Sequence, residues 1–166
     1  MQDLTAVVLA DCNDGDNLYP LTEEMPLAML PVANRPLVSF QLEMLQRAGG
    51  FSDVIIVTHA RHQPRLHAYA TEEYKGPLRL EVFVVEEGAG SADALRALRG
   101  KIHTDFVLVS GDVISDVPFQ KLADTHRLHN ASATVLFKEQ PPRAAADKKK
   151  ARTSYCLLHI IQDIIH

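Results

Sequence analysis

The chain of 166 residues has no tryptophan, two cysteines and no long uninterrupted apolar run. A membrane-spanning helix needs about 20 mostly apolar residues, so no stretch of this sequence qualifies as one. Cys12 and Cys156 are too few for a disulfide framework or a structural zinc set, which favours a reducing compartment. The first residues, Met1, Gln2 and Asp3, lack the basic start of a signal peptide. We therefore expect a soluble, intracellular protein with no membrane partner.

The sequence also lacks an excess of positive charge. It has 17 lysines and arginines against 21 aspartates and glutamates, a formal net charge of -4. Binding to DNA or to an anionic membrane depends on a basic face that neutralises phosphates. The composition therefore argues against DNA as a partner. What is present is 46% hydrophobic residues, enough for the core of one domain.

Short, continuously apolar runs alternate with amphipathic segments along the chain. The runs occupy residues 5–10, 54–58, 80–85, 106–110 and 133–137, and continuous apolarity is typical of strands covered on both faces. The segments between them, residues 36–48, 61–74, 91–98 and 118–129, show helical spacing. This alternation predicts a doubly wound, mostly parallel α/β sheet with helices on both faces.

The composition divides the chain into three parts. Residues 1–140 carry the α/β pattern, and residues 141–152, with three consecutive lysines, indicate a basic linker or loop. Residues 153–166 form an apolar tail whose pattern fits a terminal helix, a strand or a non-native end. The sequence alone leaves these three alternatives open.

Ligands of doubly wound sheets bind beyond the carboxyl ends of the strands, where three loops should converge. Asp112 lies just beyond a predicted strand, after Gly111, a position suited either to Mg²⁺ bound with a nucleotide phosphate or to simple turn capping. Asp11, Asp14 and Asp16 follow the first strand but do not match the calcium-loop pattern. We expect this acidic cluster to lie in a solvated loop.

Eight histidines raise the question of a metal site. Two pairs, His59 with His62 and His126 with His129, lie close in sequence, but no cysteine or acidic residue accompanies either pair at zinc-ligand spacing. We therefore expect surface or helix-terminal histidines, no metal site and no resident cofactor.

Four motifs in order resemble those of the nucleotide-sugar pyrophosphorylase (nucleotidyltransferase) family. They are Pro-Leu-Thr at 20–22, Leu-Pro-Val-Ala-Asn-Arg-Pro at 30–36, the segment 87–95, and Gly-Asp at 111–112, within a resemblance over about residues 5–138. The resemblance implies the fold of that family and a nucleotide pocket around Gly15, Gly90, Ser91 and Asp112, with Mg²⁺ entering only together with a nucleotide.

Two cations of that family are missing here. Asn17 stands where the family has an arginine of its glycine-rich loop, and Leu27 stands where it has the lysine of its Pro-Lys pair. These cations offset charge that develops at the triphosphate, and losing one such donor costs about 3 kcal/mol of transition-state stabilisation. We therefore expect a vestigial pocket with no catalytic residue.

Residues 30–45 and 108–137 resemble in particular the nucleotidyltransferase-like subunits of the guanine-nucleotide exchange factor for eukaryotic translation initiation factor 2. The match favours the gamma type, although Leu9, Ala10 and Asp11 are closer to the epsilon type. This resemblance implies a non-catalytic scaffold or regulatory subunit in the cytosol. It would pair with a homologous epsilon-like catalytic subunit and support GDP release from the GTP-binding initiation factor.

The alternative function is that of an active sugar-1-phosphate nucleotidyltransferase. The resemblance further implies that subunits of this kind continue into a left-handed β-helix, so we expect residues 1–140 to be a truncated domain of a larger subunit.

Overall fold

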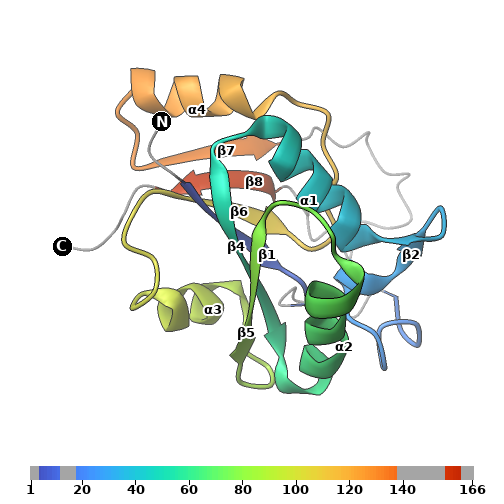
Figure 1. The fold of residues 1–166 in the computed structure, drawn as a ribbon. Coiled ribbons are helices and arrows are strands. Elements are labelled where there is room, and N and C mark those ends of the chain that lie inside the picture. The colour runs from blue at the N-terminus through green and yellow to red at the C-terminus, as the bar shows by residue number, and fades with distance from the viewer. Residues whose placement is uncertain (1–3, 12–17, 138–155, 162–166) are drawn as a thin grey trace, which may run out of the picture.

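The computed structural model describes residues 4–11, 18–137 and 156–161, and their arrangement is shown in Figure 1. Six strands form one sheet in the order β5-β4-β1-β6-β8-β7. Their bounds are β1 Leu4–Leu9, β4 Phe51–His59, β5 Arg79–Val85, β6 Phe106–Ser110, β7 Ala133–Phe137 and β8 Cys156–Ile161. The pairs β5-β4, β4-β1 and β1-β6 are parallel, whereas β8 runs antiparallel to both β6 and β7.

The central strands are apolar because both of their faces are covered. Val7 and Val8 of β1 point to opposite faces of the sheet, and both are completely buried. Four helices provide the cover: α1 Leu37–Ala48, α2 Gln63–Ala68, α3 Ser91–Leu98 and α4 Phe119–Leu128. Residues of α1, α2 and α4 share the core on one face, and α3 packs into the core on the other (Figure 1). The predicted doubly wound α/β fold is confirmed.

Two local features differ from the sequence-based expectation. The single helix predicted over residues 61–74 consists of a 3-10 turn, η2 (Ala60–His62), then α2, then a π-helical turn, η3 (Tyr69–Glu73). Pro64 lies in the first turn of α2, where its missing N–H costs no hydrogen bond, so a new helix begins there. The segment before α1 also contains a 3-10 turn, η1 (Leu27–Met29), and a small hairpin of β2 (Pro31–Val32) and β3 (Arg35–Pro36).

The apolar tail supplies a strand of the sheet. Of the three alternatives that the sequence leaves open, the structure shows a strand over Cys156–Ile161, which lies between β6 and β7. The main-chain groups of β8 therefore pair with strands on both sides. This part of the tail belongs to the same sheet as β1, β4, β5, β6 and β7. The predicted basic linker at 141–152 lies outside the described residues. Among the helices that the structure describes, none has the length and apolarity needed to cross a bilayer.

Candidate functional site at the carboxyl ends of the strands

Three parallel strands end at the same level and bring their following residues together. Leu9 of β1 pairs with Val57 of β4 on one side and with Ser110 of β6 on the other. Gly111, which follows β6, approaches β1 so closely that a Cβ atom there would lie 2.2 Å from the carbonyl oxygen of Leu9. Only glycine fits this contact, which explains the Gly-Asp motif at 111–112.

A buried glutamine of α1 holds the turn that carries Asp112. Gln41 is fully buried, and its Nε2 donates to the carbonyl oxygens of Ser110 (2.9 Å) and Val113 (3.2 Å). The hydroxyl of Ser110 in turn donates to Asp112 Oδ1 at 2.6 Å. Gln41 of α1 and Ser110 therefore both hold the turn in place, while Asp112 stays exposed.

Sequence reasoning missed Gln41 because a glutamine in an amphipathic helix is usually placed on the solvent face. The signal was nevertheless present in its spacing. Gln41 follows Val38 by three residues and precedes Leu42 and Leu45 by one and four, so it lies on the buried stripe of α1.

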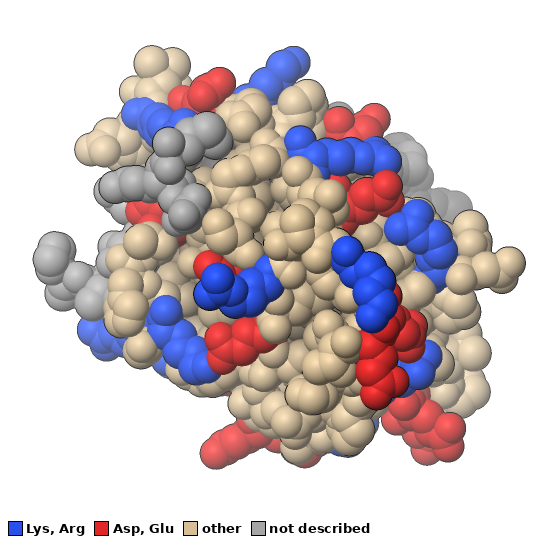
Figure 2. Space-filling model, viewed as in Figure 1, with Lys and Arg blue, Asp and Glu red and all other residues tan. Residues whose placement is uncertain are grey.

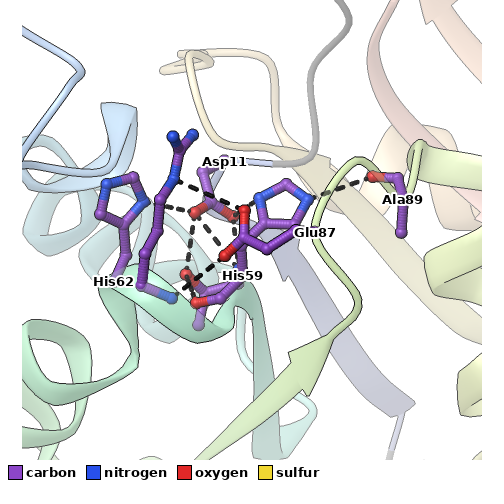
Figure 3. A network of polar contacts seen from close by, with 7 residues as sticks. Asp11, His59, His62, Glu87 and Ala89 are labelled. Atoms are coloured by element: carbon purple, nitrogen blue, oxygen red, sulfur yellow. Dashed lines mark hydrogen bonds and ion pairs between the residues drawn. The ribbon is translucent and has the colours of Figure 1, made fainter.

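Asp11, the second residue after β1, is the centre of a buried polar network (Figure 3). Its side chain is 6% exposed. The carboxylate accepts hydrogen bonds from the Thr58 hydroxyl (3.0 Å to Oδ2) and from the backbone N–H of His59 (3.1 Å to Oδ1). His62 Nδ1 lies 2.7 Å from Oδ2. A single carboxylate thereby joins the end of β1 to the end of β4 and to η2.

His59 extends this network to the loop after β5. Its Nε2 lies 3.3 Å from the carbonyl oxygen of Ala89, and its Nδ1 lies 3.4 Å from Asp11 Oδ1. Beside it, the backbone N–H of Arg61 donates to Glu87 Oε1 at 3.2 Å, and the Arg61 guanidinium lies 3.8 Å from the other Glu87 oxygen. The ends of β1, β4 and β5 are thus tied together by side chains (Figure 3).

The structure corrects two expectations about these residues. Asp11 does not lie in a solvated loop. His59, His62 and His126 are buried rather than on the surface, although His62, directly before α2, and His126, in the last turn of α4, are helix-terminal as expected. The cause is the parallel topology, which places Asp11 against residues about 50 positions further along the chain. His126 is buried on α4, where its Nδ1 lies 2.8 Å from the Thr134 hydroxyl. Of the other members of the predicted clusters, His129 is exposed at the end of α4, and Asp14 and Asp16 lie outside the described residues.

The predicted pocket residues are placed as follows. Gly90 has an extended backbone and precedes α3, and Ser91 is the first residue of that helix, next to the Ala89 carbonyl that His59 contacts. Asp112 lies in the turn after β6, and Gly15 lies outside the described residues.

The side chains of the described residues form no cluster of metal ligands. In residues 4–11, 18–137 and 156–161, no three His, Cys, Asp or Glu side chains are grouped as metal ligands. Asp112 therefore offers one carboxylate, which does not fit a resident metal ion, since Mg²⁺ bound by one or two carboxylates takes its remaining ligands from substrate phosphates and water.

A mostly parallel sheet with these motifs at the carboxyl ends of its parallel strands defines a nucleotidyltransferase-type α/β domain. The chain belongs to the nucleotidyl transferase family, whose sequence model matches residues 5–147. Its structure is similar to that of a protein described as a glucose-1-phosphate thymidylyltransferase of Bacillus anthracis, with a TM-score of 0.74 and 17% identity over 96% of this chain and 72% of that chain. This likeness shows the fold alone.

Curated relatives are more similar in sequence. Translation initiation factor eIF2B subunit gamma of Dictyostelium discoideum is 35% identical over 152 residues, which are 87% of this chain and 34% of the relative. Subunit epsilon of the same factor from Schizosaccharomyces pombe is 33% identical over 84% of this chain and 22% of the relative. A mannose-1-phosphate guanyltransferase of Candida albicans is 30% identical over 74% of this chain and 34% of the relative.

These relatives confirm the resemblance to the nucleotidyltransferase-like subunits of this exchange factor and its preference for the gamma type. The chain spans about a third of the length of the gamma relative and less of the epsilon relative.

Proposed function

We propose that this chain is the nucleotidyltransferase-like domain of a non-catalytic, gamma-type subunit of a translation-initiation guanine-nucleotide exchange complex. The similarity to gamma subunits supports the assignment to that complex. The observation that carries the non-catalytic role is the buried carboxylate of Asp11, which occupies hydrogen-bond donors at the strand ends.

A nucleotidyl transfer site must present open donors and positive charge to a triphosphate. Here the Thr58 hydroxyl, the His59 N–H and the His62 ring already bind the Asp11 carboxylate. A phosphate oxygen carrying a unit charge within about 4 Å of that carboxylate would be repelled by about 4 kcal/mol at an effective dielectric constant of 20.

The two missing cations would also weaken triphosphate binding. Leu27, at the position of the family's lysine, begins the 3-10 turn η1 and brings an apolar side chain instead of an ammonium group. Asn17, at the position of the arginine, lies outside the described residues. The donors of this site are occupied, Asp11 adds negative charge and Leu27 replaces a cation. Together these features favour a domain that keeps the fold but does not catalyse nucleotidyl transfer.

The relatives support a role within a multi-subunit complex. Because both gamma and epsilon subunits of eIF2B are similar to this chain, we propose that it pairs with a homologous epsilon-like subunit that carries the catalytic exchange activity. In this arrangement the chain serves as a scaffold in the cytosol and supports GDP release from the GTP-binding initiation factor.

The transfer reaction is tested with a pyrophosphate-release assay on the full chain with GTP, mannose 1-phosphate and Mg²⁺. A mannose-1-phosphate guanyltransferase serves as the positive control. We expect no pyrophosphate above background. Turnover that disappears in Asp112→Ala would contradict the non-catalytic role. The scaffold role is tested by co-expression with an epsilon-type subunit, for which we expect a stable complex through size-exclusion chromatography.

The second candidate is an active sugar-1-phosphate nucleotidyltransferase. It is favoured by the similarity to mannose-1-phosphate guanyltransferases and by the ordered turn around Asp112, which Gln41 and Ser110 hold in place. The same turn, with Gly90 and Ser91 at the start of α3, supports residual binding of a nucleotide in a vestigial pocket. Calorimetry with GTP and Mg²⁺ tests this, and an absence of binding heat at millimolar ligand would exclude it.

A further inference from the structure

Exposed apolar side chains gather at one end of the sheet. Eight large hydrophobic side chains among the described residues are exposed. Seven of them lie at the end where the parallel strands finish, whereas the eighth, Leu128, ends α4 at the opposite end of the sheet. Single exposed hydrophobic residues are normal on a protein surface. Seven at one end indicate an interaction surface, because soluble domains rarely expose large apolar patches.

These seven residues come from four segments, and we refer to them together as the apolar edge. Leu18, Tyr19 and Leu21 lie in the turn before η1, and Val32 lies in the β2–β3 hairpin. Ile114 and Val117 follow β6. Phe137 ends β7, which runs in the same direction as β6 because β8 is antiparallel to both. In Figure 1 the β2 hairpin and the arrowheads of β6 and β7 lie on the same side of the molecule.

The main chain just after β1 brings the first three of these segments together. The N–H of Ala28 in η1 donates to the carbonyl oxygen of Ala10 at 3.2 Å, and the Cβ position of Gly111 lies 2.9 Å from the same oxygen. η1 joins the turn at 18–26 to the hairpin, and Gly111 begins the turn that leads from β6 to α4. The turn at 18–26 is itself closed by a hydrogen bond from the N–H of Leu21 to the carbonyl oxygen of Leu18 at 2.8 Å. The exposed side chains are therefore carried by ordered main chain around one point.

The charge beside the apolar edge is mostly of one sign. Residues 18–36 and 111–118 contain one basic residue, Arg35, and four acidic residues, all of them exposed: Glu23, Glu24, Asp112 and Asp116. Arg35 lies 3.3 Å from Glu43 of α1, so its charge is already paired. On the face of the molecule that carries α1 and α2, by contrast, acidic and basic side chains are interspersed (Figure 2). The apolar edge is therefore bordered by negative charge.

We propose that the apolar edge binds a basic amphipathic segment of a partner protein. The apolar side chains of that segment cover the exposed hydrophobic residues, and its lysines or arginines face the four carboxylates. A second copy of this chain fits less well, because a symmetric contact would bring the same acidic residues of both copies together. Nucleotides and acidic peptides meet the same repulsion.

Binding is measured by fluorescence anisotropy with the full chain and a labelled synthetic helical peptide of leucine and lysine, in which the leucines form one face. Two control peptides test the chemistry: one has glutamate in place of every lysine, and the other has serine in place of every leucine. We expect saturable binding of the leucine-lysine peptide that weakens at high salt, because exposed charges are screened. Both control peptides should bind more weakly by about tenfold or more.

Four variants locate the binding on the chain. Leu21→Ser and Ile114→Ser each remove an exposed apolar side chain of the edge and should each weaken binding about five- to tenfold. Asp116→Asn removes one carboxylate and should reduce the salt dependence of binding. Leu128→Ser is the matched control, because Leu128 is also apolar and exposed but lies at the opposite end of the sheet, and it should leave the dissociation constant unchanged. All four positions are exposed, so the urea midpoints should stay close to that of the unmodified chain.

The proposal is overturned if the leucine-lysine peptide does not bind saturably, or if Leu128→Ser weakens its binding as much as Leu21→Ser does. It is also overturned if the glutamate peptide binds equally well, since the carboxylates would then play no part. Sedimentation that shows a dimer of the chain, dissociated by Leu21→Ser, would overturn it as well, since a second copy would then occupy the edge. The inference names a surface of this domain and goes beyond the proposed function, so it can fail while the outcomes of the pyrophosphate-release and co-expression tests stand.

Discussion

Replacing Asp11 by alanine is the sharpest test of how the strand ends are held together. The change removes a buried carboxylate and leaves the Thr58 hydroxyl, the His59 N–H and the His62 Nδ1 without their acceptor. The side chains of His59 and His62 are 8% and 2% exposed, so water cannot replace the carboxylate without opening the site.

The expected loss of stability can be worked from these contacts. Each buried donor left unpaired costs about 1–3 kcal/mol, and three donors lose their acceptor here, although the single losses are not additive. We therefore expect Asp11→Ala to lower the free energy of unfolding by about 3–5 kcal/mol. For a domain of this size with a total stability of about 5–15 kcal/mol, this is a large fraction.

The measurement is urea unfolding of the full chain followed by circular dichroism. Asp11→Ala should shift the midpoint to lower urea with little change in slope, since the surface exposed on unfolding stays similar. Asp112→Ala is the matched control: its carboxylate is exposed and accepts one hydroxyl, so its loss should stay below about 1 kcal/mol. Equal stability losses in the two variants would refute the assignment of Asp11 as the centre of the network.

Three further predictions concern other parts of the fold. Gly111→Ala should destabilise the protein by about 1–3 kcal/mol in the same assay, because its Cβ would lie 2.2 Å from the Leu9 carbonyl oxygen. Gly100→Ala is the control: no described atom lies within 4 Å of its Cβ position, so the change should be neutral or slightly stabilising. Gln41→Glu should lower the free energy of unfolding at neutral pH, because a buried carboxylate would face two carbonyl oxygens. The loss should shrink as the pH falls and the carboxyl takes up a proton. A loss that does not change with pH would contradict this prediction. Burial raises the pKa of Tyr69 above the ordinary tyrosine value of about 10. The stabilisation from its neutral form is therefore present below about pH 10 and is lost as the pH rises through the raised pKa. The free energy of unfolding of Tyr69→Phe should fall less at alkaline pH than that of the unmodified chain.

The sequence predicts the layers of the fold well because they depend on local patterns. β1, β4 and β6 are short runs with both faces buried, so continuous apolarity identifies them without any knowledge of their neighbours. The strand over Cys156–Ile161 is different. Its apolar residues also fit helical spacing, and its conformation depends on the open main-chain groups of β6 and β7, which no local pattern shows.

The candidate site is predicted only in part, because some of its contacts join residues that are far apart in the sequence. Gly111 and Asp112 form a motif of adjacent residues, and the structure explains it through one close backbone contact. The Asp11 network joins residues about 50 positions apart, so an aspartate in a polar loop and histidines at a strand end give no sign of burial in the sequence. The parallel topology is what places them against one another.

The two halves of the strand-end region use their polar groups differently. On the β6 side, Gln41 and Gly111 still hold the turn of Asp112 in a fixed geometry with an exposed carboxylate. On the β4 side, donors that could face a substrate are used internally by Asp11. An enzyme site keeps polar groups unsatisfied until substrate arrives and gives up stability for it. Satisfying the Thr58, His59 N–H and His62 Nδ1 groups from within gains stability and withdraws them from phosphate binding, in agreement with the proposed non-catalytic role.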